Sequence, residues 1–213
     1  MGHVLAPTVV AAGVLPAAFE SAFLIRCASP ARLPGRRAAC VSRAARPAGL
    51  IEFDREDAAV RLMTLLDGLG FQPRHEVRDG GGQRRYRVHQ VTVPGEVQPM
   101  VNRTMGAAWR QGRSTLLDTG TVGMSSPRHA QRGMLAKAAW RAALLACHRR
   151  RFMDPPGVHL GDHETAALLI RTARLLGVTV VMTRRPGCLL VTIPVADAAA
   201  LLALRAPEEP PVR

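Results

Sequence analysis

Arginine clusters are the residues of this sequence with the clearest chemical capacity. They occur at positions 84–85, 149–151 and 184–185, and Arg87 follows the first pair closely. A guanidinium group presents several N–H donors in a planar fork, which suits phosphate oxygens. We therefore expect a partner that carries phosphate groups.

The first cluster lies on a predicted β-hairpin, in which RHEVR and RRYRVHQV flank the turn sequence DGGGQ. Because side chains alternate along a strand, Arg85 and Arg87 share one face and Arg84 takes the other. On the partner strand, Arg74 and Arg78 project to the same side. We expect one of these faces to contact a phosphate backbone, and a merely solvated strand face is the alternative.

The other two clusters sit at the ends of predicted elements. Arg184 and Arg185 lie at the tip of a second hairpin, where Pro186 and Gly187 suit the central positions of a type II turn. The run Arg149-Arg150-Arg151 follows a predicted helix. It can complement the negative end of the helix dipole or reach phosphate, and the sequence leaves both roles open.

A repeat of elements positions these hairpins. Strand Val158–Leu160 precedes a helix that Asp162 can cap and Gly177 can end, and the second hairpin follows, with its first strand expected to start at Val178. Earlier in the chain, strand Ile51–Phe53 precedes a helix with Asp54 as its expected cap and Gly70 as its end. The two glycines are 177 − 70 = 107 residues apart. Only two copies occur, which predicts a domain with two related halves.

The remaining elements complete each half. We expect helices at Met100–Leu117, with Trp109 as a packing anchor, and at Gln131–His148, whose alanines allow close helix packing. The N-terminal stretch LPAAFESAFLIRCAS is the best candidate for one further helix. The predicted organisation is a poorly ordered basic segment at 1–48, halves at 49–125 and 126–206, and a disordered tail at 207–213.

Composition narrows the class of partner. The chain has 29 Lys and Arg against 16 Asp and Glu, a net charge of +13, which favours a polyanion, although an Arg-rich composition without a binding role is the alternative. Aromatic residues make up only 4%, which disfavours base stacking on single strands and favours duplex DNA. We expect no membrane span, because Pro7, Pro16 and Glu20 interrupt the apolar opening.

Cysteine and histidine spacing gives no metal signature. The four cysteines form no CxxC pair, so reduced thiols in the cytoplasm are expected. His159 and His163 flank Asp162, yet a polar helix start explains these residues better than a metal site does. We expect no cofactor, no metal and no small-molecule substrate.

The order of these segments resembles the LAGLIDADG fold, and most closely the sporulation and cell-division regulators of the WhiA family. The matching stretches are EFDREDAAVRLMTLLDGLGF, RRYRVHQV, LLDTG, AAWRAALLACHRRRFMDPPG and HETAALLIRTARLLGVTV, which cover about residues 50–205. The resemblance implies an α/β (α+β) class with a duplicated LAGLIDADG homing-endonuclease-like fold. Its two pseudo-symmetric halves would combine helices with antiparallel sheets, and their hairpins would form a concave saddle for DNA. Family members continue into a C-terminal helix-turn-helix domain, which we do not expect here because the sequence ends at Arg213.

The resemblance raises the question of nuclease activity. LAGLIDADG nucleases hold divalent metal between carboxylates at the ends of their central helices. The second central helix here ends in Ala146-Cys147-His148-Arg149, which lacks a carboxylate. Glu52 and Asp54 lie in a look-alike segment, but we interpret Glu52 as a strand residue and Asp54 as the helix cap.

These observations predict a non-catalytic, cytoplasmic and nucleoid-associated regulator of transcription that binds double-stranded DNA and acts in sporulation, cell division and chromosome segregation. The alternatives are a protein-interaction module for a regulatory partner such as a sigma factor, and an active homing endonuclease. The expected DNA-binding residues are Arg74, Arg78, Arg84, Arg85, Arg87, Arg149, Arg150, Arg151, Arg184 and Arg185.

Overall fold

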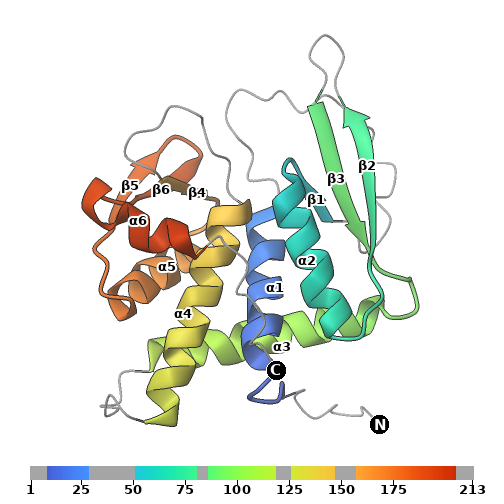
Figure 1. Ribbon diagram of the computed structural model, residues 1–213, viewed down its shortest axis with the longest axis horizontal. Helices are drawn as coiled ribbons and strands as arrows, with labels where there is room; N and C mark the ends of the chain where they lie inside the picture. The colour runs from blue at the N-terminus through green and yellow to red at the C-terminus, as the bar shows by residue number, and fades with distance from the viewer. Residues whose placement is uncertain (1–8, 29–50, 81–85, 119–125, 147–156, 205–213) are drawn as a thin grey trace.

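Two helix–strand–helix–hairpin–helix units form the computed structural model (Figure 1), which describes residues 9–28, 51–80, 86–118, 126–146 and 157–204. The first unit comprises α1 (Leu15–Ala28), β1 (Ile51–Phe53), α2 (Glu56–Gly68), β2 (Arg74–Gly80), β3 (Tyr86–Thr92) and α3 (Gln98–Leu117). The second comprises α4 (Pro127–Ala146), β4 (Gly157–Leu160), α5 (His163–Leu175), β5 (Val181–Arg185), β6 (Cys188–Thr192) and α6 (Val195–Ala203). The predicted order of elements is confirmed.

Both sheets have the same antiparallel topology. Their strand orders are β1-β3-β2 and β4-β6-β5, so the last strand of each half lies in the middle. Helix α2 packs on the first sheet and α5 on the second, while α1 and α4 lie side by side between the halves (Figure 1). Helix α3 crosses beneath them. The predicted duplication is therefore present in both topology and layering.

The ends of α2 and α5 show the repeat at the level of single hydrogen bonds. Phe71 N–H donates to the Leu66 carbonyl at 3.0 Å, and Val178 N–H donates to the Ala173 carbonyl at 2.9 Å. Gly70 and Gly177 have φ of 82° and 73°, which suits glycine because it lacks a Cβ. Each helix ends in the same Schellman-type motif, closed by a buried apolar residue after the glycine.

Besides shifts of one or two residues at the starts of α3 and β4, three predictions about how elements begin differ from the structure. Asp162 caps α5 as expected, accepting from Thr165 N–H at 2.7 Å. In the first half Arg55, not Asp54, occupies the N-cap position and makes no side-chain capping bond. Asp54 precedes this position by one residue.

The second difference concerns the start of β5. Val178 was expected to open this strand, but the strand starts at Val181 because Val178 is buried as the apolar closure of the α5 motif. The third is the start of α4, which begins at Pro127 instead of Gln131. Proline is well tolerated in a first helical turn, where its missing N–H would have no partner. His148, the expected end of this helix, lies outside the described residues.

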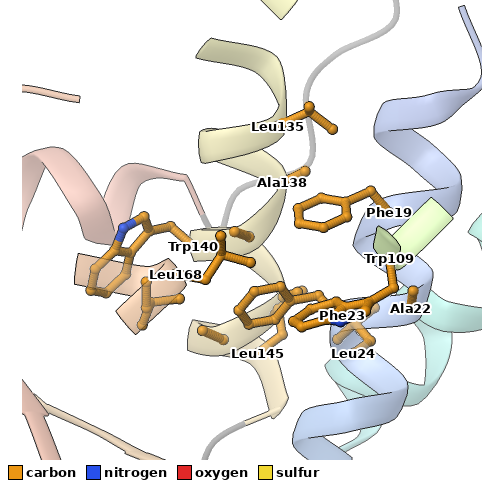
Figure 2. Packing of buried hydrophobic residues seen from close by; sticks show 14 of the residues in the cluster. Phe19, Ala22, Phe23, Leu24, Trp109, Leu135, Ala138, Trp140, Leu145 and Leu168 are labelled. Atoms are coloured by element: carbon orange, nitrogen blue, oxygen red, sulfur yellow. The ribbon is translucent and has the colours of Figure 1, made fainter. Parts of the chain in front are cut away.

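Helix α1 lies at the centre of the molecule, although the sequence analysis placed it in a segment ahead of the first half. Phe19 and Phe23 are fully buried, and both pack against Trp109 of α3 with ring centroids 5.9 and 5.7 Å away (Figure 2). The predicted anchoring role of Trp109 is confirmed. A helix this apolar is stable only when other elements cover it, which α3 and α4 do here.

Alanines allow α1 and α4 to approach closely. Ala18 and Ala22 on α1 are buried, as are the predicted contact residues Ala136, Ala139 and Ala143 on α4. Trp140 points to the opposite side of α4 from Phe23, toward Leu168 of α5 (Figure 2). Small buried residues on both helices thus accompany their close approach, and large side chains fill the core around them.

Two glycines of α3 give a matched test of this packing. A Cβ on Gly112 would overlap the ring of Phe19, whereas one on Gly106 meets only Arg110 Nη1, at 3.5 Å. We expect Gly112→Ala to lower the free energy of unfolding by about 1–3 kcal/mol. Gly106→Ala should raise it by about 0.5–1 kcal/mol through helix propensity. Urea unfolding of both variants measures the difference, and equal shifts would contradict the close approach of α1 and α3.

Candidate nucleic-acid interface

The β2–β3 hairpin is the longest projection among the described residues and extends past α2 (Figure 1). Its register pairs Arg74 with Thr92, Arg78 with Val88 and Arg87 with Asp79. Residues paired directly across a ladder point to the same face. Arg74 and Arg78 therefore share one face, as predicted, and Arg87 takes the other.

The face with Arg74 and Arg78 also carries acids. Glu76 lies between the two arginines on β2, and Arg78 Nη2 is 3.3 Å from its Oε2, with both side chains more than half exposed. Glu52 of β1 is on the same face and accepts from Gln90 Nε2 at 2.9 Å. Positive charge on this face is therefore partly neutralised before any ligand arrives.

The opposite face changes character along the strands. Val91 and His89 are buried against α2, and His75 Nε2 lies 3.1 Å from His89 Nδ1. Two residues further along β3, Arg87 is exposed and lies across from Asp79. The hairpin is thus anchored at its base by apolar and histidine packing, and its charged part projects into solvent.

The second hairpin places its arginines at the tip, as expected. Gly187 has φ of 77°, in keeping with the predicted type II turn, and Arg185 pairs with Cys188 across it. Arg184 pairs with Leu189 and so takes the opposite face of the sheet from Arg185. Both arginines are exposed. The remaining predicted site residues, Arg84, Arg85, Arg149, Arg150 and Arg151, lie outside the described residues.

The central helices present no carboxylate in their described last turns. Helix α1 ends with Arg26 in its last turn, and α4 ends in Leu144-Leu145-Ala146. Arg26 Cζ lies 3.9 Å from the centroid of the Trp109 ring, and its Nη1 lies 3.7 Å from Glu164 Oε2. This arginine is therefore held by a cation–π contact and an ion pair at the end of α1.

Residues with metal-binding side chains are dispersed. Within the part of the chain that the structure describes, no group of three or more His, Cys, Asp or Glu could hold a metal ion. His159 Nδ1 lies 3.5 Å from Cys188 Sγ, on the same face of the second sheet. Asp162, between His159 and His163, caps α5, which is the structural role predicted for it.

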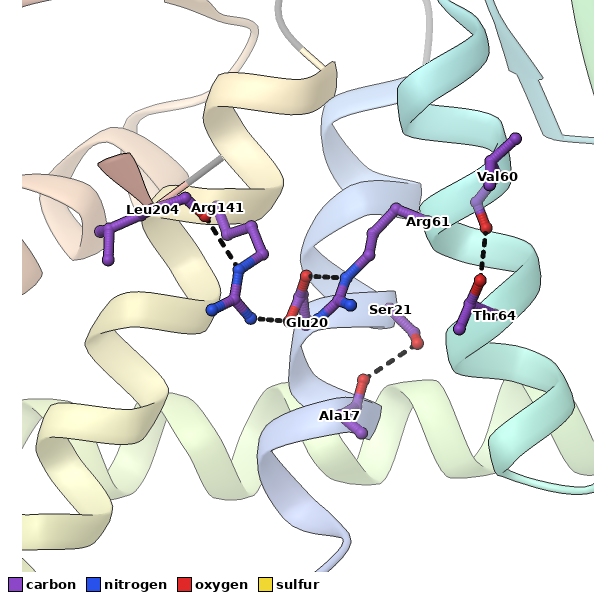
Figure 3. A network of polar contacts seen from close by, with 8 residues as sticks. All are labelled: Ala17, Glu20, Ser21, Val60, Arg61, Thr64, Arg141 and Leu204. Carbon is purple, nitrogen blue, oxygen red and sulfur yellow. Dashed lines mark hydrogen bonds and ion pairs between the residues drawn. The ribbon is translucent and has the colours of Figure 1, made fainter. Parts of the chain in front are cut away.

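The sequence analysis missed one polar cluster, which lies at the seam between the halves (Figure 3). Glu20 of α1 is 2% exposed and receives two hydrogen bonds from Arg61 of α2, at 2.7 and 2.9 Å. Arg141 of α4 adds a third at 3.1 Å and also donates to the Leu204 carbonyl after α6. A single glutamate inside an otherwise apolar helix was the available signal, because such a group must find partners when it is buried.

Comparison with known proteins assigns the fold. No family model matches the chain, and no curated protein sequence matches it. The N-terminal LAGLIDADG domain of DUF199/WhiA matches with a TM-score of 0.50 at 11% identity, over 99% of this chain and 96% of that one. The fold is a duplicated LAGLIDADG fold.

Two further LAGLIDADG structures give the same result. I-DmoI in complex with DNA and Mn has a TM-score of 0.51 at 11% identity, over 92% of this chain and 99% of that chain. Full-length DUF199/WhiA from Thermotoga maritima has a TM-score of 0.51 at 12% identity, and the match covers 95% of this chain and 63% of that one. At 11–12% sequence identity, the similarity to these structures shows the fold alone. Among the described residues, no helix is long and apolar enough to cross a membrane.

The Glu20 cluster gives a stability prediction. Glu20→Ala leaves Arg141, whose side chain is 7% exposed, without its carboxylate partner, and we expect a loss of about 3–5 kcal/mol in the free energy of unfolding. Glu76→Ala breaks an exposed ion pair and should change stability by less than about 1 kcal/mol. Glu20→Gln, which keeps the shape of the side chain, is measured alongside. Chemical denaturation that gives equal effects for Glu20→Ala and Glu76→Ala would contradict the structural role of the buried carboxylate.

Proposed function

We propose that this protein is a non-catalytic, double-stranded DNA-binding protein that uses the β2–β3 hairpin as its principal contact. The main support is its LAGLIDADG fold, which it shares with I-DmoI in complex with DNA, combined with its net charge of +13. Strands of this kind fit the major groove, where arginines can reach phosphates and base edges. Arg74, Arg78 and Arg87 carry the contact among the described residues, and Arg84 and Arg85, which precede β3 in the sequence, belong to the same proposed contact.

Aromatic burial supports duplex over single-stranded DNA as the ligand. Single strands bind through bases stacked on exposed aromatic rings. Phe19, Phe23, Trp109 and Trp140 lie in the core, with at most 4% of each exposed. Phe53 and Phe71 are also buried. The Phe and Trp side chains that the structure describes are therefore too buried to offer such a stacking platform.

We further propose a role in transcription control of the WhiA type, connected to sporulation, cell division and chromosome segregation. The support is the match to the WhiA LAGLIDADG domain across nearly the whole of both chains. Arg149, Arg150 and Arg151 follow the second central helix, and Arg184 and Arg185 lie at the second hairpin. These residues complete the proposed contact, and a nucleoid-associated location follows from the proposed ligand.

The acidic residues on the hairpin determine how much each arginine should contribute to the affinity for duplex DNA. Arg74 and Arg78 face the same way, but Glu76 already neutralises Arg78. We expect Arg74→Ala to weaken duplex binding several-fold and to lower the slope of log affinity against log salt by about one. Arg78→Ala should have a smaller effect, and Glu76→Ala should strengthen binding by freeing Arg78. Fluorescence anisotropy with a labelled random duplex over a salt series measures all three.

The matched control removes arginine from another part of the molecule. Arg103 and Arg110 are exposed on α3, which lies outside the hairpin and crosses below the central helices (Figure 1). Substituting either with alanine changes the net charge as much as Arg74→Ala does. Equal losses of affinity for hairpin and α3 variants would point to diffuse electrostatic attraction and would exclude the β2–β3 hairpin as the contact.

The proposal also predicts the outcome of a nuclease assay. The last described turns of α1 and α4 carry no carboxylate, and Glu52 is hydrogen-bonded to Gln90 on β3. Two-metal phosphodiester cleavage needs carboxylates that converge on the scissile phosphate. Supercoiled plasmid should therefore remain uncut in the presence of Mg²⁺. Nicking that Glu52→Gln abolishes would establish the nuclease alternative instead.

A further inference from the structure

Strand β5 is an exposed edge of the second sheet. It pairs with β6 on one side, and no strand among the described residues pairs with its other side. All five residues from Val181 to Arg185 are exposed, including Val181 at 56% and Met182 at 44%. An edge strand left open in this way presents a row of backbone N–H and C=O groups to any extended chain.

The corresponding edge of the first sheet differs in composition. Strand β2 has the sequence RHEVRDG, in which acids and bases intermix, and such charged edges resist pairing with another strand. Strand β5 has the sequence VMTRR, with no acid and with β-branched or apolar residues in its first three positions. The duplication has therefore produced one edge that resists strand addition and one that favours it.

The register identifies the backbone groups that point outward from β5. In a hairpin with a two-residue turn, the residues that flank the turn form a hydrogen-bonded pair, and bonded pairs alternate with non-bonded pairs. Arg185 pairs with Cys188 next to the turn, so Arg185, Thr183 and Val181 direct their backbone groups toward β6. Met182 and Arg184 direct theirs away from the sheet.

We propose that the β5 edge binds an extended, acidic segment of a partner protein by adding it to the second sheet as a fourth strand. Main-chain hydrogen bonds to Met182 and Arg184 would supply affinity, as in other cases of strand addition. Arg184 and Arg185 lie on opposite faces at one end of the strand, so carboxylates on both faces of the incoming strand would meet them. The exposed Val181 and Met182 call for apolar residues further along.

Charge and chemistry favour this occupant over two others. A second copy of the chain would bring another net charge of +13. If two copies of β5 paired in antiparallel fashion about Thr183, Arg184 would lie opposite Met182 and Arg185 opposite Val181, so neither arginine would meet an acid. Duplex DNA can use the two arginines, and its phosphates can accept from a backbone N–H, but it gains nothing from the exposed valine and methionine or from the outward carbonyl groups. The inference rests on β5 alone and does not require that the β2–β3 hairpin bind DNA.

Proline substitution tests the backbone contact directly. Met182→Pro removes an N–H that points away from β6, at an edge position where proline is tolerated. Met182→Ala is the matched control, because it removes the same side chain and keeps the N–H. The probe is a fluorescein-labelled glutamate–valine peptide in which two adjacent glutamates, which face opposite sides of an extended strand, are followed by valines. A lysine–valine peptide with lysines in place of the glutamates is its charge-reversed counterpart. Circular dichroism and unfolding of each variant verify that the fold is retained.

We expect saturable binding of the glutamate–valine peptide by the wild type. Affinity should fall about tenfold more in Met182→Pro than in Met182→Ala, because both variants lose the apolar side chain but a main-chain hydrogen bond is lost only in the first. The double variant Arg184→Glu with Arg185→Glu should prefer the lysine–valine peptide.

Three outcomes would overturn the proposal. The first is equal peptide affinity for Met182→Pro and the wild type. The second is a wild-type dimer in light scattering that Met182→Pro dissociates, which would make a second copy the occupant. The third is peptide binding that duplex DNA displaces and that depends on Arg184 and Arg185 but not on the Met182 N–H, which would assign the tip to phosphate. DNA binding is measured on the same variants. If the peptide experiment fails while Met182→Pro still binds duplex DNA, the strand-addition proposal fails and the proposed DNA-binding function stands.

Discussion

The buried carboxylate of Glu20 is the constraint on which the arrangement of the two halves depends. Burying a carboxylate to 2% exposure is unfavourable unless donors compensate for the lost water, and here the donors are Arg61 of the first half and Arg141 of the second. Arg141 also binds the carbonyl of Leu204, so the end of α6 is tied to the same point. Any relative movement of α1, α2 and α4 would separate these charges. The cluster therefore fixes the positions of the helices that carry the two sheets.

Internal roles account for a part of the positive charge of the chain. Arg132 donates to the carbonyls of Thr115 and Asp118 and so satisfies the C-terminal end of α3. Arg26 lies over Trp109, and Arg113 pairs with Glu164. The formal net charge consequently overstates how much of the surface is available to a polyanion. The position of each arginine matters more than the total, and among the described residues the hairpins hold several that face solvent.

Periodicity, capping residues and turn sequences were sufficient to predict the order of elements and the repeat. The glycines at 70 and 177 end their helices in the predicted left-handed conformation, because that conformation excludes most other residues. Asp54 shows the limit of this reasoning, since the sequence did not distinguish a cap at residue 54 from one at residue 55. Local patterns also failed to place α1. Its burial comes from contacts with α3 and α4, which are distant in sequence.

The candidate site was less predictable than the fold for a related reason. The alternation rule placed Arg74 and Arg78 on one face correctly, but it could not reveal that Glu76 pairs with Arg78, because that depends on side-chain rotamers. Likewise, strand propensity located β5 but did not indicate that both of its faces are exposed. Burial depends on which elements pack nearby, and α5 covers less of the second sheet than the apolar sequence of its strands had indicated.

The two hairpins show how duplication allows the halves to diverge. From the end of β1 to the start of the first hairpin strand, the two halves share the same 107-residue offset, since 53, 56 and 74 become 160, 163 and 181. After that point they differ: β2 and β3 have seven residues each, whereas β5 and β6 have five. The shared part packs against the central helices, where a change in one half would disturb both. The hairpins extend from this core and are free of that constraint, so a long hairpin that mixes acids and bases and a short edge that carries no acid can coexist on one scaffold.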